Sequence, residues 1–198
     1  PMAKETTLII PKGAGIGRIT ELLAVRGLIA NKLVFQLGAM ARGATKSLRA
    51  GEFVIPKFAS SEDVLRILLS GKTVVRRLTV VEGLTTAEVL DQLLLVKGLT
   101  GKISTRPGEG SLLPETYHFS YGDSREGLVQ RMRVAMSEAL RELWVKRKVG
   151  VPYKTPTEAL VMASIVERET GLAEERAKVA GVFVNRLNRG MRLQSDPT

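Results

Sequence analysis

A diverged repeat runs through the first half of the chain, with its two copies 70 residues apart. The first copy starts at Ile10-Pro11-Lys12-Gly13 and ends at Gly27-Leu28, and the second starts at Val81-Glu82-Gly83 and ends at Gly98-Leu99. Between these ends, both copies place apolar residues three and four positions apart, as on one face of an α-helix. Each copy therefore predicts a short strand, a glycine turn, an amphipathic helix and a glycine at the helix C-terminus.

Three further segments of the first half have clear local patterns. Ser60-Ser61-Glu62-Asp63 is a helix start, and the apolar residues that follow it up to Gly71 predict a third helix. Residues 52–55 and 73–80 are rich in β-branched side chains and predict two strands. Residues 6 to about 100 are thus expected to form one small α+β module.

The second half of the chain is expected to be mainly helical. Glycine and proline residues between positions 101 and 111 indicate a linker. Beyond it, apolar residues with helical spacing run from Arg125 to about Lys148, with Ser124 as a suitable N-cap. Another helix is predicted to begin at Thr155-Pro156-Thr157-Glu158, a capping box with proline at the first helical position.

These patterns predict an α+β fold in two parts. The repeat-bearing module is assigned to residues 1–105 and the mainly helical domain to residues 106–198. No apolar run reaches the roughly 18 residues that a transmembrane helix needs, and the N-terminal residues do not form a signal peptide. A segment that targets the natural protein to its compartment is therefore expected to lie outside this sequence.

The composition restricts the kinds of site and partner. A formal net charge of +10 favours an anionic partner, such as nucleic acid, an acidic lipid surface or a cell-wall polymer, although a basic solvated surface explains it equally well. Nucleic acid is disfavoured because the cations are spread along the chain without interleaved aromatic residues. The absence of cysteine and the single histidine, His118, argue against a metal centre or a Ser/His/Asp triad.

Two acidic residues end the helix that is predicted after Thr155. Its apolar residues project to nearly every side, which is typical of a buried helix, yet its last turn contains Glu167 and Glu169. A carboxyl group that apolar neighbours shield from water keeps its proton more readily and can act as a general acid. The alternative is a helix end that is open to solvent, with Arg168, Arg176 or Lys178 paired with these acids.

The same region resembles the signature of the MltG/YceG-like family of endolytic murein transglycosylases. The blocks that carry the resemblance are Ala163-Ser164-Ile165-Val166-Glu167-Arg168-Glu169-Thr170 and residues 175–176, 179–187 and 190–198. Residues 10–13, 81–83 and 110–117 resemble further blocks in the same order. The match covers essentially the whole chain, and the part after Ala163 is far more specific than a single short motif.

The resemblance implies a lytic transglycosylase that cuts the β-1,4 bond between MurNAc and GlcNAc and leaves a 1,6-anhydro-MurNAc end. It assigns Glu169 as the catalytic acid and base, and no metal or organic cofactor is required. Five other polar residues in the matching blocks are expected to orient the substrate or to brace Glu169, and these are Glu167, Asn185, Arg186, Gln194 and Asp196. Bracing is at least as good an explanation as sugar contact for each of them.

The resemblance also implies a LysM-like module followed by a catalytic domain, in a protein anchored in the inner membrane and facing the periplasm. Peptidoglycan glycan strands are the implied substrate, and cell-wall synthases are candidate partners. Relatives continue beyond the position of Thr198, so the catalytic domain is expected to be incomplete at its C-terminal end and the membrane anchor to lie outside this sequence. The alternative function is a non-catalytic glycan-binding module of a cell-wall protein.

Overall fold

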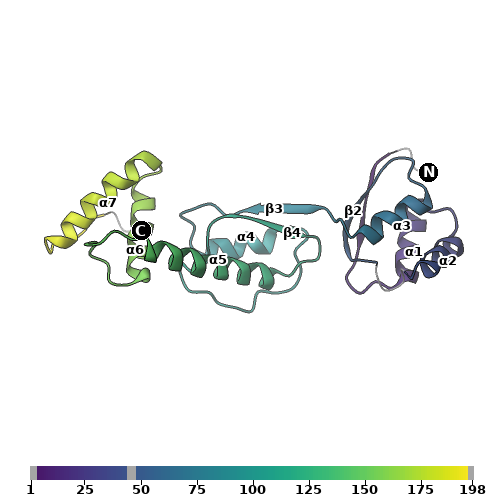
Figure 1. Ribbon diagram of the computed structural model, residues 1–198, viewed down its shortest axis with the longest axis horizontal. Helices are drawn as coiled ribbons and strands as arrows, with labels where there is room; N and C mark the ends of the chain where they lie inside the picture. The colour runs from purple at the N-terminus through teal and green to yellow at the C-terminus, as the bar shows by residue number, and fades with distance from the viewer. Residues whose placement is uncertain (1–3, 44–47, 196–198) are drawn as a thin grey trace. The chain divides into compact units, whose positions relative to one another are not determined.

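A computed structural model describes residues 4–43 and 48–195 of the chain (Figure 1). The described residues form helices and short strands in an α+β arrangement, which confirms the predicted fold class. The elements in chain order are β1 (Thr6–Ile10), α1 (Ile16–Val25), α2 (Lys32–Ala41), β2 (Gly51–Ile55), α3 (Ser61–Ser70), β3 (Val75–Thr79), α4 (Thr86–Leu95), β4 (Thr116–Ser120), α5 (Arg125–Val145), α6 (Pro156–Glu169) and α7 (Ala173–Asn188).

The predicted repeat is confirmed at the level of secondary structure. Helices α1 and α4 begin and end 70 residues apart, and each follows a strand, β1 or β3. In both copies, a glycine with a left-handed backbone ends the turn between strand and helix, with φ of +77° at Gly13 and +79° at Gly83. Residues other than glycine rarely adopt this backbone conformation, which explains why both copies have glycine at this point.

The chain folds into two compact units that are not contiguous in sequence. The first unit comprises residues 1–78, 96–101 and 118–124, and the second comprises 79–95, 102–117 and 125–198. This division differs from the single boundary predicted after residue 105, because α4 groups with α5 to α7. Local patterns identify α1, α3, α4, α5 and α6 but miss α2, and they do not specify the neighbours against which a helix packs.

The core of the first unit is formed by β1, α1, α2, β2 and α3. Strands β1 and β2 pair antiparallel, with Leu8 opposite Phe53 and Thr6 opposite Ile55. Their inward side chains join apolar residues of the helices in one buried cluster, which includes Leu8, Ile10, Ile19, Leu23, Phe35, Phe53, Ile55, Val64, Leu65 and Leu68. The predicted third helix is α3, and a capping box between Ser60 and Asp63 fixes its start.

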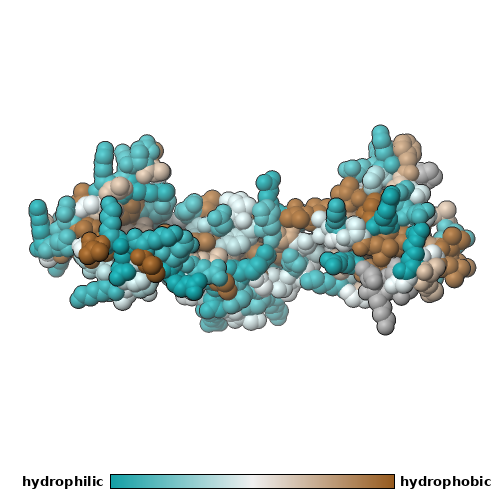
Figure 2. Space-filling view, viewed as in Figure 1, coloured by the Kyte–Doolittle hydropathy of each residue, from teal (hydrophilic) through white to brown (hydrophobic). Residues whose placement is uncertain are grey.

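Helix α2 is apolar on both of its sides. Phe35 and Ala39 are buried in the core, whereas Leu33, Leu37 and Met40 lie on the opposite side and are exposed. Figure 2 shows apolar surface over this helix. Helix α2 therefore leaves an uncovered apolar stripe within the described residues.

One buried ion pair interrupts the apolar packing of the first unit. The carboxylate of Glu52, on β2, is almost fully buried and accepts hydrogen bonds from Arg76 Nε at 2.7 Å and Nη2 at 3.0 Å. This hydrogen bonding to Glu52 raises the pKa of the Arg76 guanidinium. The Arg76 guanidinium also lies 6.0 Å from the centroid of the Tyr121 ring. Arg76 thereby connects β2, β3 and the segment after β4.

The segment predicted as a linker is held in place by two glutamates of the second unit. The Glu109 carboxylate accepts hydrogen bonds from the Thr86 backbone N–H, at 3.0 and 3.1 Å, at the start of α4. The Glu126 carboxylate, in the first turn of α5, accepts from the Ser104 N–H at 2.6 Å and from the N–H and hydroxyl of Thr105. The segment is therefore tied to both neighbouring helices.

Replacing Glu126 by glutamine should lower the melting temperature (Tm) by a few degrees at neutral pH. The hydrogen bond from the Thr105 hydroxyl, followed by those from the two backbone N–H groups, lowers the pKa of Glu126. A carboxyl group with a lowered pKa stabilises the fold above its unfolded-state pKa of about 4.3, and this contribution is lost as the pH falls through the folded-state pKa. Thermal melts should therefore give a Tm difference that is largest near pH 7 and closes toward about pH 3.

Glu138→Gln is the matched control for this measurement, because Glu138 lies exposed on the same helix. Its Tm should follow that of the wild type at every pH. A difference between wild type and Glu126→Gln that stays constant with pH would contradict the proposed role of the carboxylate charge.

Helix α5 is the longest helix of the second unit. Leu128, Val129, Met132 and Met136 are buried, as the predicted apolar stripe requires, but Leu143 near the helix end is exposed. The apolar stripe of α5 therefore packs into the core only along the first part of the helix. Over the described ranges, no helix combines the length and the apolar character needed to cross a membrane.

Candidate active site

Helices α6 and α7 carry most of the residues that the sequence singles out. Helix α6 starts where it was predicted, with Thr155 as the N-cap and Pro156 in the first turn. The Thr155 hydroxyl oxygen accepts a hydrogen bond from the Glu158 N–H at 3.2 Å. The Glu158 carboxylate accepts from the N–H of Lys154, one residue before the N-cap, at 2.7 Å. The start of the helix is thus fixed by both side chains.

The predicted burial of α6 on all sides is wrong. Only Met162 and Val166 are buried, and they form a small apolar cluster with Phe183 of α7. Val161, on another side of the helix, is 55% exposed. Apolar residues around a whole helix require neighbours on every side. Within the described residues α6 packs on α7 and α5, which leaves part of its surface open.

The corner between α6 and α7 is built around Thr170. This residue is buried, its N–H donates to the Val166 carbonyl at 3.2 Å, and its hydroxyl donates to the Glu175 carboxylate at 2.9 Å. The same hydroxyl accepts a hydrogen bond from the Leu172 N–H at 3.1 Å. Three hydrogen bonds at one residue define the turn and hold the end of α6 beside the start of α7. Threonine directly after the two glutamates was the available sequence signal for this corner.

Glu167 is half-buried and paired with a cation of α7. Arg176 Nη2 donates to Glu167 Oε1 at 2.9 Å, and the two side chains are 28% (Glu167) and 43% (Arg176) exposed. This pair corresponds to the alternative in which the arginine neutralises an acid at the helix end. Arg176 Nε is buried and has no hydrogen-bond partner within the described residues. Glu167 is therefore part of the brace between α6 and α7.

Glu169 is the last residue of α6, and its side chain is exposed. The expectation that it lies among apolar side chains in a cleft is therefore wrong for this structure. Helix α7 contacts Val166 and Glu167 in the last turn, whereas Glu169 lies at the very end of the helix and is left exposed. No hydrogen bond or ion pair of its carboxylate is found within residues 4–43 and 48–195, so Glu169 is free where Glu167 is engaged.

Arg186 and Gln194 form a second group of predicted site residues. Arg186 Nη1 donates to the Leu193 carbonyl at 2.6 Å and to Gln194 Oε1 at 2.9 Å, which fixes the segment after α7. Gln194 has a left-handed backbone, with φ of +55°, so this segment makes a tight bend. Asn185 precedes Arg186 on α7 and is exposed, and Asp196 lies outside the described residues.

The structure does not bring the two groups together. Arg186 lies 13 positions after Ala173 on α7, which corresponds to roughly 20 Å along the helix axis at about 1.5 Å per residue. Glu167 and Glu169 lie at the corner with the start of α7, whereas Arg186 and Gln194 lie near its end. The predicted site residues therefore occupy two ends of one helix pair.

Comparison with known proteins identifies the family. The sequence model of the YceG-like family matches residues 8–198. The endolytic murein transglycosylase of Streptococcus pneumoniae serotype 2 strain D39 is 29% identical over 98% of this chain and 42% of its own length. The protein of the same name from Bacillus subtilis strain 168 is 28% identical over 96% of this chain and 61% of its own. The chain thus spans less than two thirds of either relative.

A crystal structure of a yceG-like protein from Listeria monocytogenes is 26% identical, with a TM-score of 0.49 over 98% of this chain and 74% of that chain. The motifs at Glu167 and Glu169 and those between residues 175 and 198 all lie within the matched range of the family. The resemblance identified from these motifs is thereby confirmed, and the chain belongs to the YceG-like family.

Proposed function

We propose that this chain belongs to an endolytic murein transglycosylase that cuts the β-1,4 bond between MurNAc and GlcNAc and leaves 1,6-anhydro-MurNAc ends. The observation that carries the proposal is the exposed carboxylate of Glu169 at the end of α6, which has no partner among the described residues and lies in the range that the YceG-like family model matches. The relatives from Streptococcus pneumoniae and Bacillus subtilis, both named endolytic murein transglycosylases, support the same reaction.

Glu169 supplies both proton transfers of the proposed reaction. Its protonated form gives a proton to the bridging oxygen, and the C1–O bond to the leaving sugar breaks. The carboxylate then takes the proton from the 6-hydroxyl of MurNAc, whose oxygen bonds to C1 and closes the anhydro ring. One carboxyl group therefore acts as acid and then as base, and no metal or organic cofactor takes part.

The structure supports different roles for the two glutamates. Glu167 Oε1 already accepts a hydrogen bond from Arg176, so this side chain is committed to bracing the corner. Glu169 carries no such partner among the described residues and is accessible to a glycan strand. We assign proton transfer to Glu169 and positioning of the α6 end to Glu167.

Asn185, Arg186, Gln194 and Asp196 are proposed to orient the glycan strand or to brace the site. The supporting observation is the hydrogen bonding of Arg186 to the segment around Gln194, which fixes the chain on the C-terminal side of α7. Because Arg186 lies near the opposite end of α7 from the corner, its contact with a sugar would be distant from the bond that is cut.

The proposal extends to the rest of the protein. Residues 1–105 are assigned as a LysM-like glycan-binding module, and the β1–α1–α2–β2 connectivity around one antiparallel pair supports this. Residues 106–198 are assigned to the catalytic domain. We further propose that the full-length protein is anchored in the inner membrane, faces the periplasm and acts on peptidoglycan glycan strands together with cell-wall synthases.

Mass spectrometry of sacculi digested by the full-length protein tests the reaction. We expect products that end in 1,6-anhydro-MurNAc, and digestion with the Glu169→Gln variant is the control. Reducing ends would indicate a hydrolase instead. Binding of sacculi without any new ends would support the alternative, a non-catalytic glycan-binding module.

A further inference from the structure

The end of α5 and the loop that connects it to α6 combine many cations with uncovered apolar side chains. We call residues 141–154 the basic loop, and its cations are Arg141, Lys146, Arg147, Lys148 and Lys154. Its one acid, Glu142 of α5, pairs with Lys146 directly after the helix. Val145 is 78% exposed and Val149 is fully exposed, so apolar surface lies open beside the charges. A surface with both properties fits a ligand that is anionic and partly apolar.

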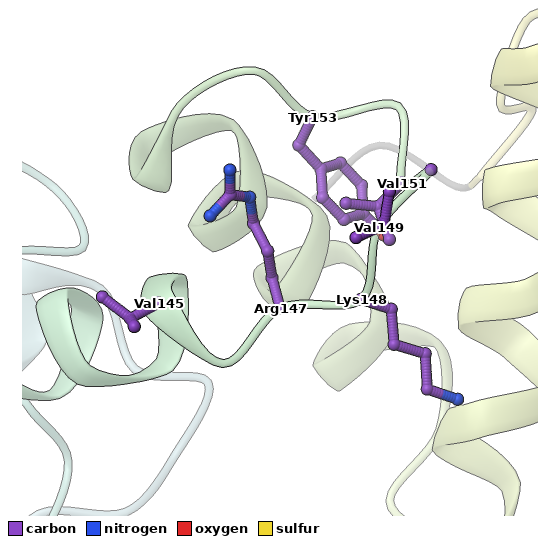
Figure 3. A pocket seen from close by; sticks show the side chains of 7 residues that line it. Val145, Arg147, Lys148, Val149, Val151 and Tyr153 are labelled. Carbon is purple, nitrogen blue, oxygen red and sulfur yellow. The ribbon is translucent and has the colours of Figure 1, made fainter.

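The basic loop encloses an open pocket of about 310 Å³. Four apolar or aromatic side chains line it, namely Val145, Val149, Val151 and Tyr153, together with Arg147 and Lys148. Figure 3 shows Val149, Val151 and Tyr153 gathered on one side of the pocket. Arg147 and Lys148, which directly precede Val149, extend from the backbone in different directions. Burial raises the pKa of the Tyr153 hydroxyl, in keeping with its position as the wall of the pocket. The cations thus lie on two sides of a small apolar wall.

Arg147 is held in position before any ligand arrives. Its guanidinium carbon lies 4.0 Å from the centroid of the Trp144 ring, and its Nη1 donates to the Trp144 carbonyl at 2.7 Å. Neither Arg147 nor Lys148 forms an ion pair with an acid within the described residues. A guanidinium that is stacked and bonded on one side keeps its remaining N–H groups for an anion, at a lower entropic cost than a mobile side chain.

We infer that the basic loop binds the acidic peptide that branches from a murein strand, which extends the function proposed above and rests on it. The peptide's carboxylates match Arg147 and Lys148, and the methyl groups of its alanines match the valines and Tyr153. A flat lipid surface fits less well, because Val151 and Tyr153 line the same pocket as the exposed valines and the cations. The loop would then hold the peptide while the adjoining helix α6 presents Glu169 to the glycan.

Trp144 provides a direct probe, because it is the single tryptophan of the chain. We would titrate the 198-residue protein with disaccharide–peptide fragments of murein that carry free carboxylates, and follow Trp144 fluorescence and heat of binding. The same fragments with amidated carboxylates and the peptide-free disaccharide are the comparison ligands. We expect saturable binding of the acidic fragment, with binding of the other two weaker by on the order of tenfold, the loss expected for charge-assisted hydrogen bonds.

Two pairs of variants separate a local site from general charge. Arg147→Gln should weaken binding of the acidic fragment by about tenfold, and Lys148→Gln by a smaller factor, because only Arg147 is fixed in advance. Arg106→Gln and Lys102→Gln remove the same charges from exposed positions outside the basic loop and should bind as the wild type does. Because Arg147→Gln alters the surroundings of Trp144 itself, calorimetry is the deciding readout for that variant.

Three results would overturn the inference. Equal affinity for the acidic and amidated fragments would exclude recognition of the carboxylates, and equal affinity for the peptide-free disaccharide would indicate a sugar site. A shift of Trp144 emission with phosphatidylglycerol vesicles, but not with the fragments, would assign the loop to a lipid surface. None of these measurements requires cleavage, so they are independent of the anhydro-product test. Intact peptide binding with no anhydro ends from the full-length protein would reject the reaction and retain the peptide site.

Discussion

Replacement of Glu169 by glutamine should lower the rate of glycan-strand cleavage by about 10² to 10⁴, because general acid–base catalysis typically contributes that factor. Glutamine keeps the shape of the side chain but cannot deliver the proton. The fold should be unaffected, since Glu169 is exposed and makes no hydrogen bond or ion pair in the described part of the chain, and such surface changes usually stay within about 0.5 kcal/mol. Turnover of purified glycan strands by the full-length variant measures the loss of rate, and its Tm measures the stability of the fold.

Glu167→Gln is the matched variant, two residues earlier on the same helix. It weakens the pair with Arg176, so it should reduce stability by up to about 1 kcal/mol, as expected for a partly exposed ion pair. Its effect on turnover should be smaller than that of Glu169→Gln, because the glutamate braces the corner without touching the reacting atoms. If the Glu167 variant is folded but inactive and the Glu169 variant is active, the assignment within the pair is wrong.

Arg76→Met should destabilise the first unit by about 2 to 3 kcal/mol. The substitution leaves the Glu52 carboxylate buried without its bidentate partner, and breaking a buried pair in this way usually costs about 3 to 5 kcal/mol. We place the value below that range because about a third of the Arg76 side chain is exposed (36%), and water can partly solvate the orphaned carboxylate. Urea unfolding of the 198-residue protein at neutral pH gives the difference directly.

Two further variants test whether the unpaired, buried charge of Glu52 causes the destabilisation expected for Arg76→Met. Arg18→Met breaks an exposed pair with Glu21 in the same unit, and its cost should be below about 1 kcal/mol. Combining Arg76→Met with Glu52→Gln removes the orphaned charge and should recover part of the lost stability. Equal effects of Arg76→Met and Arg18→Met, or no recovery in the double variant, would show that the ion pair contributes little.

Much of the secondary structure follows from short patterns in the sequence. The glycines at 13 and 83, the helix start at Ser60 and the N-cap at Thr155 all lie where they were predicted. These features involve residues a few positions apart, so their physical cause is contained in a short window of sequence. The repeat that relates α1 to α4 is recognised in the same way, because each copy has its own short pattern and the two patterns lie 70 residues apart.

The candidate site was harder to predict because it depends on contacts between distant residues. The helical projection placed Glu169 among apolar side chains, but the projection says nothing about how many elements pack against the last turn. The same limit applies to Glu126, whose hydrogen bonds to Ser104 and Thr105 turn a predicted linker into a tethered segment. Glu52 and Arg76 are 24 positions apart, and no short pattern indicates that they pair.

The way in which the chain alternates between the two units has a consequence for its biosynthesis. The first unit includes residues 96–101 and 118–124, so it cannot be complete until Ser124 has left the ribosome. By then residues 79–95 and 102–117, which belong to the second unit, have also been made. A chain truncated after residue 78 would contain the whole apolar core of the first unit, but it would lack residues 96–101 and 118–124 of that unit. The apolar core of the first unit can therefore form early in synthesis, whereas the rest of that unit is added only after most of the residues between positions 79 and 117 have been made.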